Sequence, residues 1–360
     1  MKIVSVVGAR PQFIKAALVS KKVRELGMNE ILVHTGQHYD FNMSDVFFEE
    51  LDLPRPDSNL GIGSGSHGEQ TGKMLIEVEK VLLKEKPDMV LVYGDTNSTL
   101  AGALASVKLH IPVAHIEAGL RSFNKRMPEE INRVLTDHIA DILFTPTEVA
   151  VKNLENEGIK KGVYNVGDVM FDISLEIAKI IDVKTILLKF GLENKNYILA
   201  TIHRADNTDI RENLENILEA FKEISSKYKI FFPVHPRTKN ALIGFNLMNS
   251  IPNNLVLSEP VSYKEMVALE QGAKLIVTDS GGVQKEAYFF KVPCVTVREE
   301  TEWVELVEAK WNKLTGVNKE KIIKSVFEEL DRKQYPEWID FYGGGKASER
   351  IVRILVNGSK

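Results

Sequence analysis

Short apolar runs rich in β-branched residues recur along the chain, and helical stretches separate them. In the first half these runs lie at 2–7, 31–35, 89–93, 113–116 and 142–145. Runs that are apolar at nearly every position are typical of strands buried on both faces of a parallel sheet. The regular alternation of such strands with helices predicts an α/β fold with a doubly wound parallel sheet.

A second alternating series begins after about residue 168. Its strands are predicted at 197–202, 230–234, 255–257, 275–277 and 294–297. The sequence therefore predicts two Rossmann-like domains, 1–170 and 171–345. Sheets of this type bind ligands at the carboxyl ends of their strands. Two such domains facing each other would form a central cleft between them.

The segments between strands have simpler patterns. Residues 54–68 are rich in glycine, serine and proline and are predicted to form a loop, with helices on either side at 42–51 and 69–86. Helical patterns also cover 100–109, 172–192 and the amphipathic C-terminal stretch 347–356. A turn-rich stretch precedes this last helix.

The stretch 275–287 has the clearest functional pattern, because it predicts a strand, a glycine turn and a helix in succession. Ser280-Gly281-Gly282 allows a sharp turn, and the first free N–H groups of the following helix attract a phosphate. Glu286 lies about one helical turn further on, where its carboxylate could accept hydrogen bonds from the two hydroxyls of a ribose. The pattern predicts a nucleotide half-site, although an ordinary strand-to-helix connection with a Gly-Gly turn has the same appearance.

Composition narrows the class of protein. The chain has 360 residues, of which 44% are hydrophobic and 27% charged, and its formal net charge is −4, which is typical of a soluble enzyme and argues against a nucleic-acid binder. The single cysteine, Cys294, excludes a disulfide framework and is predicted to be a core residue. Because no apolar run approaches the roughly 18 residues of a membrane span and the first strand is too short for a signal peptide, we expect a cytoplasmic protein.

Motifs for metal or nicotinamide binding are missing from the sequence. Gly8-Ala9-Arg10-Pro11 follows the first strand but lacks the glycines of a GxGxxG fingerprint. HExxH, CxxC and metal-binding aspartate clusters are absent as well. We therefore expect neither a bound metal nor a cofactor.

Polar side chains follow strand after strand, at the edge where a ligand is expected. They are Arg10 and Lys15, then Asp95, Glu117 and Arg121, Glu129 and Glu130, His203 and Arg204, His235 and Arg237, and finally Ser280, Gly281, Gly282 and Glu286. Each has a structural alternative. Asp95 could cap a helix, Glu129 and Glu130 suit a helix N-terminus, Arg121 could be a solvated surface charge, and His235 a loop residue. Their recurrence at successive strand ends favours function.

These motifs, taken in order, resemble the non-hydrolysing UDP-N-acetylglucosamine 2-epimerase family. The matching stretches run from residue 8 to about 305 and comprise Gly8-Ala9-Arg10-Pro11 with Lys15, Thr35-Gly36-Gln37-His38, Gly94-Asp95-Thr96, 115–121, 128–133, His203-Arg204, Pro233-Val234-His235 and 278–286. The resemblance implies a glycosyltransferase-B-like fold, with the terminal helix 346–360 crossing back to the first domain. It also implies a homodimer that interconverts UDP-GlcNAc and UDP-ManNAc without NAD or metal, and that supplies ManNAc-derived surface polysaccharide or glycan synthesis.

The resemblance also implies roles for individual residues. UDP would leave C1 of the sugar as the C2 proton departs, giving 2-acetamidoglucal, and would then add back as a proton arrives on the other face. The acid–base groups would be Asp95, Glu117 and Glu129, with His203 helping the phosphate leave; which carboxylate serves which step stays open. The substrate, UDP-GlcNAc or UDP-ManNAc, and the UDP intermediate would be bound by Arg10, Lys15, His235, Ser280, Gly281, Gly282 and Glu286.

Two departures from the family pattern stand out. Trp303 replaces an arginine that bacterial members carry in Thr-Glu-Arg-Pro-Glu, and Ala205 replaces the second arginine of His-Arg-Arg-Glu-Asn. Many bacterial members bind a second UDP-GlcNAc as an activator, and Gln37, His38 and Glu130 match parts of that site. Since the arginine is missing at Ala205, we expect weak or absent activation.

Three other functions share some of these features. A UDP-sugar glycosyltransferase would have the same fold and nucleotide half-site but would need an acceptor groove. A nucleotide-sugar sensor would not need three carboxylates at strand ends. A hydrolysing epimerase that releases free ManNAc differs from the proposed family only in its motif pattern.

Overall fold

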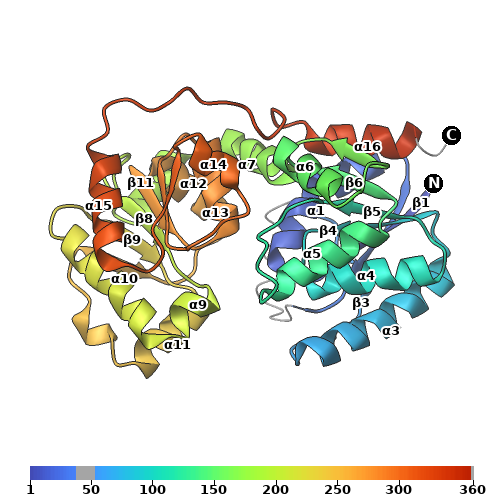
Figure 1. Cartoon of the computed structure of the whole chain (residues 1–360), viewed down its shortest axis with the longest axis horizontal. Coiled ribbons are helices and arrows are strands. Elements are labelled where there is room, and N and C mark those ends of the chain that lie inside the picture. The colour runs from blue at the N-terminus through green and yellow to red at the C-terminus, as the bar shows by residue number, and fades with distance from the viewer. Residues whose placement is uncertain (38–52, 358–360) are drawn as a thin grey trace. The chain divides into compact units, whose positions relative to one another are not determined.

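The computed structural model describes residues 1–37 and 53–357, which fold into two compact units (Figure 1). Residues 1–175 and 340–360 belong to the first unit, and residues 176–339 form the second. The helix predicted at 42–51 and the motif residue His38 lie outside the described residues.

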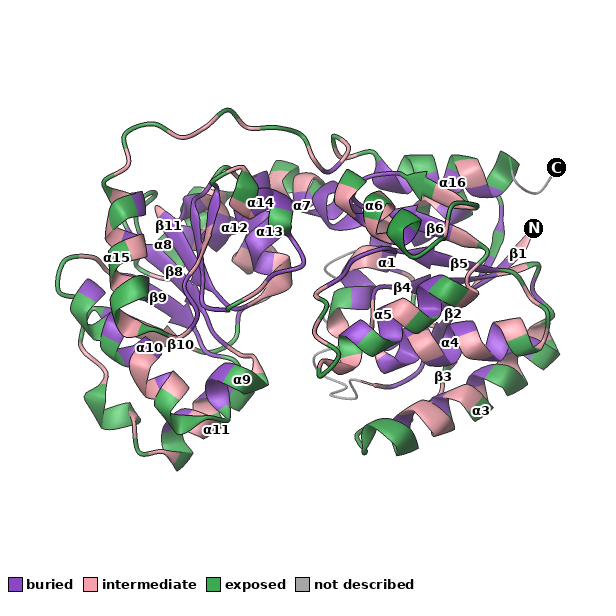
Figure 2. Cartoon of the chain, in the orientation of Figure 1, coloured by how far each residue is buried: buried purple, intermediate pink, exposed green. Residues whose placement is uncertain are grey.

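The first unit contains a seven-stranded sheet in the order β3-β2-β1-β4-β5-β6-β7, and every pair of neighbouring strands is parallel. The strands are β1 Lys2–Val7, β2 Asn29–His34, β3 Ser58–Asn59, β4 Met89–Tyr93, β5 Val113–Ile116, β6 Ile142–Thr145 and β7 Val163–Asn165. Figure 2 shows the central strands as buried, and their valines, such as Val4 and Val92, are fully enclosed. The parallel α/β sheet predicted from continuous apolar runs is thereby confirmed.

Helices connect these strands and cover the sheet. They are α1 Arg10–Glu25, α3 His67–Glu85, α4 Asn97–Lys108, α5 Pro128–Ile139, α6 Glu148–Asn156 and α7 Val169–Ile180, followed at the end of the chain by α16 Ala347–Asn357. Pro11 lies in the first turn of α1, where its missing N–H costs nothing. The start of α16 is fixed by Asp172 of α7, whose carboxylate accepts from the N–H groups of Ala347 at 3.0 Å and Ser348 at 2.7 Å.

The second unit contains a six-stranded parallel sheet in the order β10-β9-β8-β11-β12-β13. Its strands are β8 Ile198–Thr201, β9 Ile230–Pro233, β10 Leu255–Ser258, β11 Leu275–Thr278, β12 Cys294–Thr296 and β13 Asn312–Leu314. Its helices are α8 Val183–Lys189, α9 Ala205–Thr208, α10 Arg211–Ile224, α11 Pro236–Gly244, the 3₁₀ turn η1 Met248–Ser250, α12 Tyr263–Gly272, α13 Gly281–Phe289, α14 Val304–Glu308 and α15 Lys319–Leu330. Cys294 is buried in β12, as predicted.

The structure corrects the predicted elements at three sheet edges and one helix end. β3 lies inside the predicted loop 54–68, and β7 and β13 were not predicted at all. Helix α4 begins at Asn97, three residues before the predicted start at Leu100. Its first turn is stabilised by Thr96, whose hydroxyl accepts from the N–H of Thr99 at 3.4 Å.

Candidate active site

In the first unit, predicted site residues meet around Gly94, at the end of β4. Lys15 of α1 forms an ion pair with Glu117, which follows β5. A Cβ atom at Gly94 would lie 2.9 Å from Lys15 Nζ and 3.2 Å from Glu117 Oε2, so only glycine leaves room for this pair. Asp95 is the next residue, and Arg10 opens α1 at the end of β1.

Asp95 is held by helix α5 and does not cap α4. Its carboxylate pairs with Arg133, and its backbone carbonyl accepts from Asn132 Nδ2 at 3.0 Å. Arg133 also pairs with Glu130 at 2.7 Å. Because Thr96 caps α4, the interpretation of Asp95 as a helix cap is wrong. Its side chain remains about a quarter exposed, at 28%, which leaves it accessible to a ligand.

The backbone of Glu117 adopts an unusual conformation. Its φ is +72°, in the left-handed region that residues with a Cβ rarely occupy. Its N–H donates to the carbonyl of Phe144 at 3.0 Å, which ties this turn to β6. Non-glycine residues in such conformations concentrate at functional sites, where the surrounding structure enforces the strain.

His115 lies beneath this cluster and was given no role by the sequence analysis. It is fully buried in β5, with Nδ1 at 2.7 Å from Asp137 Oδ1 and Nε2 at 2.7 Å from the carbonyl of Gly94. Asp137 also accepts from the N–H of Gly119 at 3.0 Å and from Arg121 Nη1 at 2.7 Å. Through this network α5 fixes the turn that precedes Asp95.

The electrostatics of Asp137 follow from these partners. Burial by itself would raise the pKa of its carboxyl, but the hydrogen bond and charge of His115 and the charge of Arg121 outweigh burial and hold the pKa below its ordinary value. Arg121 is buried and also pairs with Glu157 at 2.7 Å. The interpretation of Arg121 as a solvated surface charge is therefore wrong.

The two acids at the start of α5 have different surroundings. Glu130 is only 2% exposed and accepts from the N–H groups of Ser122 and Phe123, each at 2.9 Å. Burial opposes ionisation, yet these N–H groups and Arg133 keep the pKa of Glu130 below its ordinary value. Glu129 is exposed. The structure therefore brings Asp95 and Glu117 together with Lys15 and leaves Glu129 on the surface.

The family resemblance assigns Gln37 and Glu130 to a site for a second, activating UDP-GlcNAc, and the structure gives each of them hydrogen-bond partners within the protein. Gln37 Oε1 accepts from Ser98 N at 3.1 Å and from Ser98 Oγ at 2.7 Å. Ala205 is exposed at the start of α9. The structure thus shows Gln37 and Glu130 engaged within the first unit.

In the second unit, the predicted nucleotide half-site has the expected local geometry. β11 leads into the turn at Ser280, and Ser280 Oγ caps α13 by accepting from the N–H of Val283 at 3.4 Å. A Cβ atom at Gly281 would lie 3.5 Å from Trp303 Nε1 and 4.0 Å from Arg204 Nη2. Trp303 therefore lies against the turn with its side chain buried.

Asp279 organises the polar groups beside this turn, a role that its sequence position does not predict. Its buried carboxylate accepts from the N–H groups of His203 at 3.0 Å and Arg204 at 2.9 Å, and from Asn207 Nδ2 at 3.0 Å. The rings of His203 and His235 lie 5.5 Å apart. The structure thus gathers His203, Arg204 and His235 at neighbouring strand ends. His235 also has a structural role, since it caps α11.

Glu286 lies in the second turn of α13, close to the glycines. It is 3% exposed, and its Oε1 accepts from the hydroxyl of Tyr263 at 2.6 Å. A Cβ atom at Gly282 would lie 3.8 Å from Glu286 Oε2, so this oxygen is directed toward the turn. A carboxylate in this position can accept from ligand hydroxyls while the helix N-terminus holds a phosphate.

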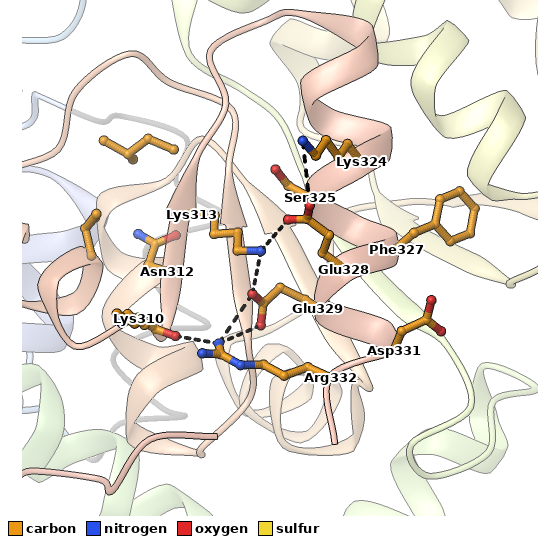
Figure 3. A pocket seen from close by; sticks show the side chains of 12 residues that line it. Lys310, Asn312, Lys313, Lys324, Ser325, Phe327, Glu328, Glu329, Asp331 and Arg332 are labelled. Atoms are coloured by element: carbon orange, nitrogen blue, oxygen red, sulfur yellow. Dashed lines mark hydrogen bonds and ion pairs between the residues drawn. The ribbon is translucent and has the colours of Figure 1, made fainter. Parts of the chain in front are cut away.

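A separate hollow of about 890 Å³ lies beside β13 and α15 (Figure 3). Lys313 pairs there with Glu328 at 2.8 Å and with Glu329 at 2.9 Å, and Arg332 pairs with Glu329 at 3.2 Å. These charges neutralise one another, and no predicted site residue lines the hollow. We therefore place the candidate site at the strand ends.

Two further properties concern the described part of the chain, 1–37 and 53–357. Within it, no three His, Cys, Asp or Glu side chains gather closely enough to hold a metal ion. The helices of the same ranges include none that is both long and apolar enough to cross a membrane.

Comparison with known proteins gives consistent matches over nearly the whole chain. The family model described as UDP-N-acetylglucosamine 2-epimerase matches residues 21–356. A UDP-N-acetylglucosamine 2-epimerase homolog from Methanococcus maripaludis is 60% identical, with 99% of this chain and 100% of the relative covered. A UDP-2,3-diacetamido-2,3-dideoxy-D-glucuronate 2-epimerase from Pseudomonas aeruginosa is 52% identical, with 99% of each chain covered.

Solved structures agree with these matches. A crystal structure of the Methanocaldococcus jannaschii UDP-GlcNAc 2-epimerase in complex with UDP-GlcNAc and UDP has a TM-score of 0.93 and 50% identity, and covers 99% of this chain and 100% of that one. The expected glycosyltransferase-B-like α/β fold, with two parallel sheets flanked by helices, is confirmed.

Proposed function

The chain belongs to the UDP-N-acetylglucosamine 2-epimerase family, whose members are isomerases, and we propose that it interconverts UDP-GlcNAc and UDP-ManNAc. The observation that supports this most strongly is the pairing of a glycine turn at the N-terminus of α13 with Glu286 in the same helix. This arrangement suits a diphosphate and a ribose. The 50% identical relative of solved structure, which is named for this activity and holds UDP-GlcNAc and UDP, supports the choice of substrate.

UDP binding is assigned to the second unit. The N–H groups at the start of α13 and the charge of Arg204 and His235 would stabilise the diphosphate, because helix N-termini and cations both attract anions. Glu286 would accept from the ribose hydroxyls. His203, held by Asp279, would donate to the departing phosphate.

The proton transfers are assigned to the first unit. Removal of the C2 proton, with the C1–O bond electrons leaving on UDP, gives 2-acetamidoglucal and UDP, and the reverse addition on the other face completes inversion. Such transfers need positioned acids and bases. Asp95 and Glu117 are positioned by Arg133 and Lys15, and Glu129, which is exposed, is the third candidate. Arg10 and Lys15 would assist in substrate binding.

The test is turnover of UDP-GlcNAc in D₂O, followed by proton NMR. Formation of UDP-ManNAc with deuterium at C2, together with scrambling of a bridging-oxygen label into non-bridging positions, is the expected result. Glu155→Gln, which changes an exposed acid of α6, serves as the matched control and should behave as the wild type. Product without deuterium and with the label intact would refute elimination, and release of free ManNAc would indicate a hydrolysing enzyme instead.

A second substrate is supported by one observation, the 52% identity to a UDP-2,3-diacetamido-2,3-dideoxy-D-glucuronate 2-epimerase. That sugar has a second acetamido group and a carboxylate. Parallel assays with both UDP-sugars decide between them, since a higher kcat/KM for the diacetamido sugar would reassign the substrate while leaving the reaction the same.

Homodimer formation and supply of ManNAc-derived glycan synthesis remain proposals that rest on family resemblance. Sedimentation of the purified chain tests the first: a single monomeric species at micromolar concentration would contradict it.

A further inference from the structure

Helix α12 carries a buried acid for which the proposed reaction gives no role. Glu270 is fully buried, and within the described residues neither of its carboxylate oxygens has a hydrogen-bond donor. Its carboxyl group instead interacts with the carboxyl group of Glu286 on the neighbouring helix α13. Two carboxylates in such a place cannot both be ionised at modest cost, so a proton must be shared between them.

Among the described residues, the charge that acts on Glu270 is that of Glu286, and no cation acts on it. Glu286 faces it from α13, Tyr197 from the start of β8 and Cys294 from β12. On α12 itself, Tyr263 donates to Glu286. Lys285, which precedes Glu286 on α13, is buried with its Nζ 4.1 Å from the centroid of the Trp303 ring. Lys189 of α8 pairs with Glu265, and Lys195 Nζ donates to the carbonyls of Gln271 and Ala273.

We propose that Glu270 is a positioning residue of the UDP site, which holds one proton and donates it in a hydrogen bond to Glu286. Glu286 then stays ionised and accepts from Glu270 and Tyr263 on its buried side, while its Oε2 is directed toward Gly282, where the ribose hydroxyls would lie. This role rests on the proposed function, because it assigns UDP to the turn at 280–282.

The electrostatics favour this placement of the proton. Burial and the negative charge of Glu286 together raise the pKa of Glu270 well above its ordinary value. A proton on Glu286 would instead use one of its oxygens as a donor and weaken its contact with ribose. Loss of the proton at alkaline pH would leave two adjacent negative charges, and repulsion would displace Glu286 from its binding position.

Two variants separate the effect of the titratable proton on Glu270 from the effect of its hydrogen-bond donor. Glu270→Gln keeps the shape and supplies a permanent N–H donor, so UDP affinity should match the wild type at neutral pH and lose its alkaline decline. Glu270→Leu keeps roughly the same volume but removes the donor, so affinity should fall several-fold at neutral pH and show no further decline in alkali. Glu259→Gln makes the same chemical change at an exposed acid just before α12 and should keep the wild-type pH profile.

The experiment combines calorimetry of UDP binding with infrared spectroscopy of the free protein. Binding is measured above pH 7, where the terminal phosphate, with a pKa of about 6, no longer titrates. The wild type should show a protonated carboxylic acid band at neutral pH that is missing in Glu270→Gln. An identical band in both proteins, or an alkaline loss of affinity that persists in Glu270→Gln, would overturn the role of Glu270.

The outcomes also distinguish this role from the proposed function. If the wild type shows the carboxylic acid band but binds no UDP at any pH, the UDP site is refuted. Glu270 would then be a protonated buried acid that positions no ligand-binding group. If Glu270→Leu does not fold, the spectrum and pH profile of Glu270→Gln still decide the matter.

Discussion

The two units place polar residues at the same edge of similar parallel sheets, yet they hold those residues in different ways. In the first unit the acids are paired with cations: Glu117 with Lys15, Asp95 with Arg133, and Asp137 with Arg121. In the second unit they are held mainly by N–H and O–H donors, as Asp279 is by two backbone N–H groups and Glu286 by Tyr263.

This difference indicates what each half is suited to do. A carboxylate beside a lysine or arginine can gain or lose a proton while its neighbour compensates the charge, which suits acid–base chemistry. Acceptors fixed by backbone donors cannot change charge without breaking the local structure, which suits firm retention of a ligand. Substitutions of Asp95 and Glu117 in the first unit should therefore change rates, and substitution of Glu286 in the second should change affinity.

The largest expected effect is on the rate, after loss of an acid in the first unit. Asp95→Asn and Glu117→Gln keep shape but remove basicity, so each should lower kcat by about 10²–10⁴-fold. UDP affinity, measured by calorimetry, should stay within error of the wild type. A variant that loses UDP affinity as strongly as kcat would show that the two units do not divide the work in this way.

The next largest effect is expected on the free energy of unfolding. Its dependence on pH should have opposite signs for Asp137 in the first unit and Glu270 in the second. The pKa of Asp137 is lowered in the folded state. Its carboxylate therefore stabilises the fold at pH values above its unfolded pKa, and this stabilisation is lost as pH falls. The pKa of Glu270 is raised, so stability is lost as pH rises from its unfolded pKa toward its folded one.

Asp137→Asn should accordingly cost about 1.5–3 kcal/mol at neutral pH, the usual contribution of a hydrogen bond to a charged group, and less in acid. Glu270→Gln should stabilise the protein, increasingly from acid to neutral pH. Denaturant unfolding across this range measures both. Parallel pH curves for the wild type and either variant would contradict the assignment for that residue.

A change of similar or smaller size is expected in ligand affinity from Glu286→Ala. Removal of a polar partner should weaken UDP binding by about 1–3 kcal/mol, with kcat at saturating substrate changed much less. Calorimetry with UDP provides the measurement, and Glu259→Gln the control. Unchanged UDP affinity would remove Glu286 from ribose binding.

The smallest effect concerns regulation. Because Ala205 lacks the arginine of related activator sites, UDP-ManNAc turnover should follow a hyperbolic rate curve with no requirement for added UDP-GlcNAc. Ala205→Arg should introduce at most weak activation. A strongly sigmoidal curve in the wild type would show that the second unit has a regulatory role beyond UDP retention.

The sequence predicted the central strands well, because continuous apolar runs such as 89–93 have few alternatives to a buried parallel strand. It missed β3, β7 and β13, each only two or three residues long. Polar side chains are frequent in these segments, and they are strands only because β2, β6 and β12 provide hydrogen-bonding partners. Edge strands of this kind have no hydrophobic signal of their own.

For the candidate site, the sequence predicts the positions of residues at strand ends but not the contacts of their side chains. Topology alone places Asp95, Glu117 and His203 at strand ends, but it cannot show that Lys15 meets Glu117, 102 positions away in the sequence. Nor does a charged residue in an ordinary helix, such as Glu270, reveal that it is buried. Both depend on side-chain packing, which only the folded chain shows.

The left-handed backbone of Glu117 has a consequence for the evolution of the protein. Such a conformation costs a residue with a Cβ about 1–2 kcal/mol relative to glycine. Selection for heat resistance alone should therefore favour glycine at 117 only together with replacement of Lys15, because Glu117→Gly by itself would leave that largely buried cation without its partner. Selection for turnover should keep the acid. Position 117 would then separate lineages that retain catalysis from lineages that keep only the fold.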